Sequence, residues 1–261
     1  MFYAYPVRIC MLSLLLHSIP TYAQVAWEDG YNIQKFGRVK DEATFNTSGG
    51  IIGLKYSEIG GSPFWKSDYA IAALYKKERK SATAPVKINL FKDEIYFLNG
   101  EEELVLEEQD ITKIVFSNAG DTATFIRRSP NIFLNGKKVE GFVQVMNAGR
   151  YELLKYTKKE VGSVDSAMNY KRYYFSETIH YFLKDIEKVE RIKKLDDKSI
   201  LPYLPQSNKC SDWIKTNHID LRKEKDVIFF LNYYNSTPQT KGISAVNPGK
   251  PVNKSSPKTV I

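Results

Sequence analysis

The chain has 261 residues, 13% of them aromatic, and a formal net charge of +8. This length and aromatic content supply a hydrophobic core. They exclude a small scaffold held by disulfides, because Cys10 lies in an amino-terminal apolar stretch and leaves Cys210 without a partner. The excess of lysine and arginine fits either anionic partners, such as lipid headgroups or acidic glycans, or the solubility of a surface with scattered charges.

The amino-terminal stretch has the pattern of a secretory signal peptide. A basic residue, Arg8, precedes an apolar run over residues 9–16, and the small residues Thr21 and Ala23 come just before the expected cleavage point. The apolar run is shorter than the roughly 20 residues that span a bilayer. We therefore expect residues 1–23 to be removed, no transmembrane segment, and a product exported to the periplasm or the extracellular medium.

The centre of the chain is a run of short segments with alternating polarity. Val86, Ile88 and Leu90 alternate with polar residues, which is the period-two pattern of a half-buried strand. Asn-Gly pairs at 99–100 and 135–136 suit tight turns between antiparallel strands. A polar link is expected later, over residues 160–169. The pattern predicts strands over residues 51–56, 69–76, 86–90, 94–98, 104–106, 111–116, 122–127, 142–146, 150–158, 171–175, 179–184 and 188–194.

From Asp196 the periodicity changes to helical spacing. Asp196 or Asp197 can cap a short helix, and Ser207 can cap the next one. A third helix is expected over residues 223–234, because four large apolar residues recur at i, i+3, i+4 and i+7. These four residues are Val227, Phe230, Leu231 and Tyr234.

Together these patterns predict an α+β fold that is mostly β. We expect an antiparallel β-meander of about ten strands with short carboxyl-terminal helices packed on it. The expected organisation is a single domain over residues 24–235, whose helical part is 196–235. Residues 236–261 are rich in proline, glycine, serine and lysine, and are expected to form a disordered basic tail.

Basic and aromatic residues follow one another in the segment 171–182. Because strand residues alternate between faces, these side chains must appear on both sides of the sheet. If exposed, they form an aromatic and basic platform for a glycan or a protein partner of the envelope. If the carboxyl-terminal helices cover them, they belong to the core. The candidate binding residues are Tyr173, Tyr174, His180 and Tyr181.

No stretch carries a recognisable pattern for catalysis, a cofactor or a metal. His180 and His218 fall in different structural zones, and His180 is expected in a strand beside aromatic residues. The leading hypothesis is a non-catalytic binding or scaffold protein of the envelope. An exported hydrolase with a dispersed Ser/His/carboxylate site is the alternative. A nucleic-acid partner is not expected, because charges in the last helix alternate in sign.

Two tripeptides match the Asp-Ser/Thr-apolar pattern of envelope O-glycosylation. They place candidate acceptors at Thr122 and Ser166. Both residues are expected in turns or links, where a bulky glycan can be accommodated.

Four motifs resemble those of a group of uncharacterised exported β-rich proteins of Bacteroidota. They are the Gly-Ser-Pro-Phe stretch at 61–64, the strand pair around 85–98, the Gly-Arg-Tyr-Glu-Leu-Leu-Lys-Tyr hairpin at 149–156 and Leu-Asn-Tyr-Tyr-Asn at 231–235. The resemblance covers residues 60–235. Because its motifs are turns and packing aromatics, it implies a fold and an envelope location, and it assigns no site.

Overall fold

The structure is a computed structural model that describes residues 26–27, 36–47, 50–106, 110–118, 121–127, 131–165, 171–186, 188–205 and 207–237. The expected signal peptide over residues 1–23 lies outside the described residues. So do Ser166 and residues 238–261 of the expected tail.

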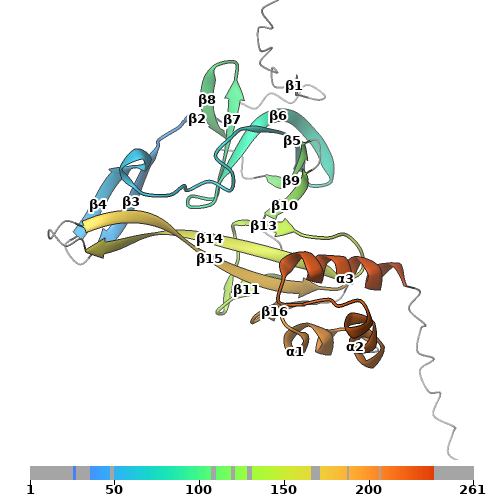
Figure 1. Cartoon of the computed structure of the whole chain (residues 1–261). Coiled ribbons are helices and arrows are strands. Elements are labelled where there is room, and N and C mark those ends of the chain that lie inside the picture. Colours follow the sequence, from blue (N-terminus) through green and yellow to red (C-terminus); the bar gives the residue numbers. More distant parts are fainter. Residues whose placement is uncertain are drawn as a thin grey trace, which may run out of the picture.

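A large antiparallel sheet organises the described part of the chain (Figure 1). Its strands are β1 (Ala26–Trp27), β2 (Phe36–Arg38), β5 (Ala70–Lys76), β6 (Arg79–Asn89), β7 (Glu94–Asn99), β8 (Glu102–Leu106), β9 (Ile111–Asn118), β10 (Asp121–Arg127), β13 (Phe142–Val145), β14 (Glu152–Asp165), β15 (Lys171–Lys184) and β16 (Val189–Ile192). Eleven strands follow the order β16-β15-β14-β13-β10-β9-β5-β6-β7-β8-β2, and β1 pairs with β6 beside this path.

The expected fold class is confirmed, since the fold is mostly β with short helices after the last strand. The meander has an interruption that the sequence did not predict. Strand β9 pairs with β5 and not with its chain neighbour β8. This pairing places Ile114 beside Leu74, and both side chains are almost fully buried. Burial of apolar surface therefore decides the order where chain proximity favours another one.

The strands from β5 to β10 enclose the first part of the core. Trp65 packs on Phe116 and Phe125, with ring centroids 5.0 and 4.9 Å away. The residues around this tryptophan come from every strand between β5 and β10. The apolar side chains of these strands are thus buried together on one side of the sheet, as the alternating pattern predicts.

Strands β14 and β15 form one long hairpin whose register runs without a shift from Glu152↔Lys184 to Asp165↔Lys171. The prediction of a polar link over residues 160–169 is wrong as far as Asp165, because residues 160–165 belong to β14. The two strands expected at 171–175 and 179–184 are a single strand, β15. A strand that faces solvent does not need apolar residues. Backbone hydrogen bonds and cross-strand pairs such as Lys159–Glu177, 3.3 Å apart, hold it together.

A second ribbon, β3 (Glu42–Thr47) with β4 (Gly50–Lys55), lies over the far end of this hairpin (Figure 1). The strand expected over 51–56 corresponds to β4, whereas β3 was not predicted. Its Ala43 is fully buried, and Phe45 packs on Tyr173 with ring centroids 5.2 Å apart. After β4 comes a short 3-10 helix, η1 (Tyr56–Glu58).

The helices cover the other end of the hairpin on one face (Figure 1). They are α1 (Asp197–Ile200), the 3-10 helix η2 (Leu201–Tyr203), α2 (Ser207–Thr216) and α3 (Glu224–Ser236). The predicted cap is confirmed, because the backbone N–H of Ser199 donates to Asp196 Oδ1 over 2.8 Å. The four apolar residues predicted for α3 are buried and pack with Tyr151, Leu153 and Leu183 of the hairpin.

A small hairpin covers the opposite face at the same end. It consists of β11 (Phe133–Leu134) and β12 (Lys137–Lys138), and its flanking residues Ile132 and Val139 are buried against Leu154 and Phe182. This end of the long hairpin is therefore packed on both faces.

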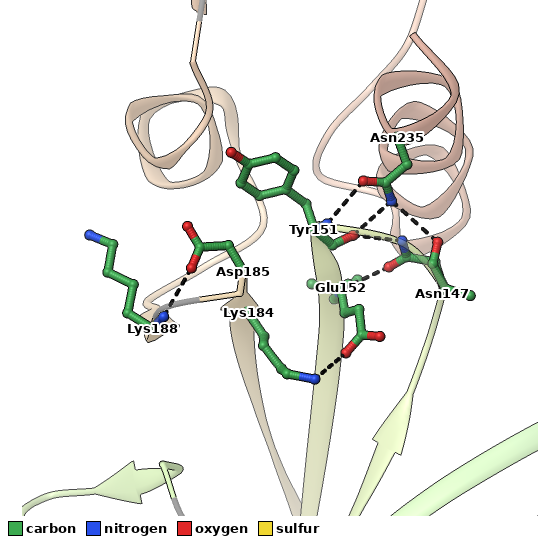
Figure 2. A network of polar contacts seen from close by, with 9 residues as sticks. Asn147, Tyr151, Glu152, Lys184, Asp185, Lys188 and Asn235 are labelled. Atoms are coloured by element: carbon green, nitrogen blue, oxygen red, sulfur yellow. Dashed lines mark hydrogen bonds and ion pairs between the residues drawn. The ribbon is translucent and has the colours of Figure 1, made fainter. Parts of the chain in front are cut away.

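Asn235 of α3 fastens the helix to the turn before β14 (Figure 2). Its side chain accepts from the Tyr151 N–H over 2.9 Å, and donates to the carbonyl oxygens of Tyr151 and Ala148 over 2.9 and 3.2 Å. Gly149 has φ +136°, and a Cβ there would lie 2.6 Å from Cγ of Asn235. Two of the motifs that carry the resemblance, 149–156 and 231–235, thus meet in space.

Candidate functional site

The long hairpin has two faces with different surroundings. The face that bears Val161, Tyr173 and Phe175 packs against the β3–β4 ribbon at one end, and continues to the helices at the other. We call it the covered face. The open face is the opposite side beyond residue 157, and its cross-strand pairs are Lys158↔Thr178, Glu160↔Ser176, Gly162↔Tyr174 and Val164↔Arg172.

The four candidate binding residues are divided between these faces. Tyr173 and Tyr181 lie on the covered face, where the β3–β4 ribbon covers the first and α3 contacts the second. Tyr174 lies on the open face, and His180 lies at its border with the packed end. Of the four, only Tyr174 is exposed, whereas the other three are half-buried, and only Tyr181 contacts a carboxyl-terminal helix. No common site contains all four side chains.

Tyr181 takes part in a polar contact that fixes the start of α3. Its hydroxyl donates to Glu224 Oε2 over 2.6 Å, and Lys155 Nζ lies 2.9 Å from the same oxygen. Burial by itself raises the pKa of Glu224, but the hydrogen bonds from Tyr181 and Lys155 outweigh it and hold the pKa below its usual value. The carboxylate also stands in the first turn of a helix, where negative charge is favourable. Tyr181 is therefore structural.

Tyr174 stands between two glycines that belong to neighbouring backbone segments. Gly162 is its partner on β14, and a Cβ there would lie 2.9 Å from Cζ of the Tyr174 ring. On the other side, Gly60 donates its N–H to the Tyr173 carbonyl over 2.9 Å and accepts from the Phe175 N–H over 2.8 Å. With no side chain on either flank, the ring lies across Gly162 and is 42% exposed.

Polar and charged side chains surround this ring on the open face. Arg172 and Val164 form the pair beyond it, and Glu160 and Ser176 form the pair before it. Ser176 Oγ donates to the Glu160 carbonyl over 3.1 Å, and Lys158 forms an ion pair with the Glu160 carboxylate. The open face therefore offers a flat ring with the donors of Arg172 beside the apolar Val164 on one side, and the donors and acceptors of Glu160 and Ser176 on the other.

His180 is surrounded by aromatic and cationic groups. Its ring stacks on Tyr156 with centroids 6.2 Å apart, and Arg191 Nη2 lies 3.4 Å from its Nδ1. Burial and the positive charges of Arg191 and Lys158 lower the pKa of His180. These neighbours include neither the serine nor the carboxylate that a histidine-based hydrolytic site requires.

The structure places one of the two candidate glycosylation residues. Thr122 is exposed and lies in strand β10 opposite Ser117, in agreement with the strand expected over 122–127 and not with the turn that the glycosylation hypothesis assumed. Ser166 lies outside the described residues.

A polar cluster that the sequence did not single out lies on strands β6 to β8. Lys87 Nζ is 2.9 Å from Glu103 Oε1, and it lies over the rings of Phe64 and Tyr69 at 4.1 and 4.6 Å. The Tyr69 hydroxyl donates to the same carboxylate, and burial together with this contact raises the pKa of Tyr69. Sequence alternation placed Lys87 on the solvent side. The aromatic residues that cover Lys87 lie in a turn segment, and the periodicity of the sequence does not predict where such a segment lies.

An open groove of about 540 Å³ lies between the start of α1 and the loop before α3. Its charged side chains already bind one another, since Lys194 pairs with Asp196 over 3.2 Å and Arg222 with Asp220 over 2.8 Å. Among the described residues, no three His, Cys, Asp or Glu side chains gather to hold a metal ion. In the described ranges of the chain, no helix is long and apolar enough to cross a membrane.

Comparison with known proteins gives no relative for this chain: no family model, no curated protein and no solved structure matches it.

Proposed function

We propose that this chain is an exported, non-catalytic binding protein of the bacterial envelope that holds a glycan on the open face of the β14–β15 hairpin. The observation that carries this proposal is the exposed Tyr174 ring between Gly60 and Gly162. A flat ring with no side chain beside it can stack on the apolar C–H face of a sugar, and both glycines give the sugar close access to the ring.

The surroundings of the ring favour a polar ligand over an apolar one. Arg172 and Lys158 supply donors, and Glu160 and Ser176 supply acceptors, within two cross-strand pairs of Tyr174. Sugar hydroxyls use both kinds of group, and Arg172 favours acidic sugars, since Lys158 is already paired with Glu160. Export is supported by the signal-peptide pattern over residues 1–23.

Binding of oligosaccharides to the chain from residue 24 onward tests this proposal. A panel of neutral and acidic oligosaccharides identifies a ligand, and isothermal titration calorimetry measures its affinity. Tyr174→Ala removes the stacking surface, and Gly162→Ala displaces the ring because the added Cβ collides with it. We expect either change to weaken binding by about tenfold or more, as loss of a central aromatic contact does.

Phe133→Ala is the matched control, because Phe133 is a comparably exposed ring on β11, whose hairpin packs at the other end of the β14–β15 hairpin, against Leu154 and Phe182. This variant should bind as the unmodified protein does. The proposal is wrong if no oligosaccharide binds above background at low salt. It is also wrong if Tyr174→Ala binds with unchanged affinity.

A further inference from the structure

Helices α2 and α3 carry a second group of aromatic side chains on their outer side. The Trp213 ring stacks on Tyr233 with centroids 3.9 Å apart and an interplanar angle of 10°, and Phe229 lies 6.1 Å from the same tryptophan. Phe229 is 58% exposed and Tyr233 is 39% exposed. We call these three residues the aromatic helix patch.

Trp213 packs against the core, but the two exposed rings of the patch, Phe229 and Tyr233, are not needed to close it. The buried residues of α3 occupy its inner face, whereas Phe229 and Tyr233 are one turn apart on the side that points away from the sheet. A soluble surface rarely keeps several large rings together in water, so an exposed aromatic group marks a contact surface.

The charges around the patch are mainly positive. Lys225 lies one turn before Phe229 on α3, Lys209 lies one turn before Trp213 on α2, and both are exposed. The two acidic residues of α3 have partners elsewhere: Glu224 binds Tyr181 and Lys155, and Asp226 accepts from the Asp220 N–H over 2.9 Å. Helix α2 has one acidic residue, Asp212, against two lysines.

The chain that follows α3 extends this positive charge. Helix α3 ends next to the patch, where the N–H of Thr237 donates to the carbonyl of Tyr233 over 3.1 Å. Residues 238–261 contain no aspartate or glutamate, and their lysines are Lys241, Lys250, Lys254 and Lys258.

We propose that the aromatic helix patch docks on an anionic lipid surface, with its rings among the headgroups and the lysines of α2 and α3 on the phosphates. The four lysines of residues 238–261 add positive charge to this end of the chain. Tryptophan and tyrosine are the aromatic residues that membrane interfaces accept best, and lysines beside them add attraction to anionic lipid. Burial of apolar surface and attraction of cations to anionic lipid add together in binding at the membrane interface. The open face lies at the opposite end of the hairpin (Figure 1), so docking leaves it free.

Vesicle co-sedimentation with the chain from residue 24 onward tests the proposal. One set of vesicles contains phosphatidylglycerol and phosphatidylcholine, and the other contains phosphatidylcholine alone. We expect at least about tenfold tighter binding to the anionic vesicles, weakened by added salt because the attraction is electrostatic.

Two changes separate the contribution of the exposed rings to vesicle binding from that of the basic residues after Thr237. The double variant Phe229→Ser with Tyr233→Ser removes the exposed rings and should lower binding about tenfold, whereas Phe133→Ser, an exposed ring elsewhere, should leave it unchanged. Truncation after Thr237 should weaken binding several-fold and reduce its salt dependence. Phe229→Ser alone, at the more exposed ring, serves as the test if the double variant melts at a lower temperature.

Equal binding to both kinds of vesicle, or binding to neither, overturns the proposal. So does a folded Phe229→Ser variant that binds anionic vesicles as tightly as the unmodified protein. Loss of binding in Phe133→Ser as well would show general adhesion of exposed rings and would also overturn it.

Discussion

The two ends of the β14–β15 hairpin are built from the same two strands in one unbroken register, yet they have different surroundings. At the base, residues 151–156 and 180–184, helices cover one face and the β11–β12 hairpin covers the other. In the arm beyond, the β3–β4 ribbon covers one face, and no described element covers the other. The pairing of the strands is the same in both halves. What packs on each face therefore decides which residues are structural and which are available for binding.

The largest expected effect is at the base. Truncation after Leu221 removes α3, whose fully buried side chains each contribute roughly 1.5 to 3 kcal/mol, against a total stability of about 5 to 15 kcal/mol. We expect this chain to aggregate or to lack a cooperative melting transition. Truncation after Thr237 should keep the melting temperature of the unmodified protein, as followed by circular dichroism. A cooperative transition at that temperature in the shorter chain would contradict the packing of α3 on the base.

A smaller effect is expected where Asn235 meets the turn at Gly149. Asn235→Ala leaves the Tyr151 N–H without its partner and should cost about 1 to 3 kcal/mol. Gly149→Ala should also destabilise, through its φ of +136° and its collision with Asn235. In the double variant the collision is gone, so urea denaturation should show a cost below the sum of the two. Simple additivity would mean that the two residues do not compete for space.

Neighbouring tyrosines in the arm provide the sharpest test of the two faces. Tyr173→Ala removes a ring packed on Phe45 and should cost about 2 kcal/mol. Tyr174→Ala removes an exposed ring and should cost less than about 1 kcal/mol. Thermal or urea unfolding measures both. Equal costs would show that the open face is packed after all.

The smallest expected effect concerns protonation at the border of base and arm. Burial and the charges of Arg191 and Lys158 lower the pKa of His180 from its ordinary value of 6.5. The folded state therefore favours the neutral ring. The preference of the folded state for neutral His180 contributes to the free energy of unfolding above pH 6.5, and this contribution is lost as the pH falls through the lowered pKa. Proton NMR should show the pKa of His180 rising in Arg191→Ala. No change would mean that burial and Lys158 set the pKa without Arg191.

Local patterns predicted the elements whose burial is one-sided and regular. The α3 stripe from Val227 to Tyr234 has helical spacing, and Ile88 and its neighbours alternate, so periodicity alone indicates the buried face. The polar strand segments around Glu160 and Ser176 lack this signal, because solvent on the open face accepts any side chain. Strand β3 was missed for a related reason: apart from Ala43 and Phe45, its residues are polar.

The candidate site could be predicted only in part. Sequence analysis named Tyr174, but its exposure depends on two glycines that reach it through long-range pairing, Gly162 from β14 and Gly60 from the segment after η1. No spacing rule connects residues 60, 162 and 174. Tyr173 and Tyr181 were predicted together with Tyr174, because alternation shows that a strand has two faces but does not show what covers each face.

The contact between Asn235 and Tyr151 also sets an order of events during synthesis. The two residues are separated by 84 positions in the chain. At about 5 to 20 residues per second, a ribosome needs roughly 4 to 17 s to advance from one to the other. Through that interval Leu153 and later Leu183 have no helix to cover them. Until its last helix emerges, the nascent chain therefore has an apolar strand surface that this helix cannot yet cover.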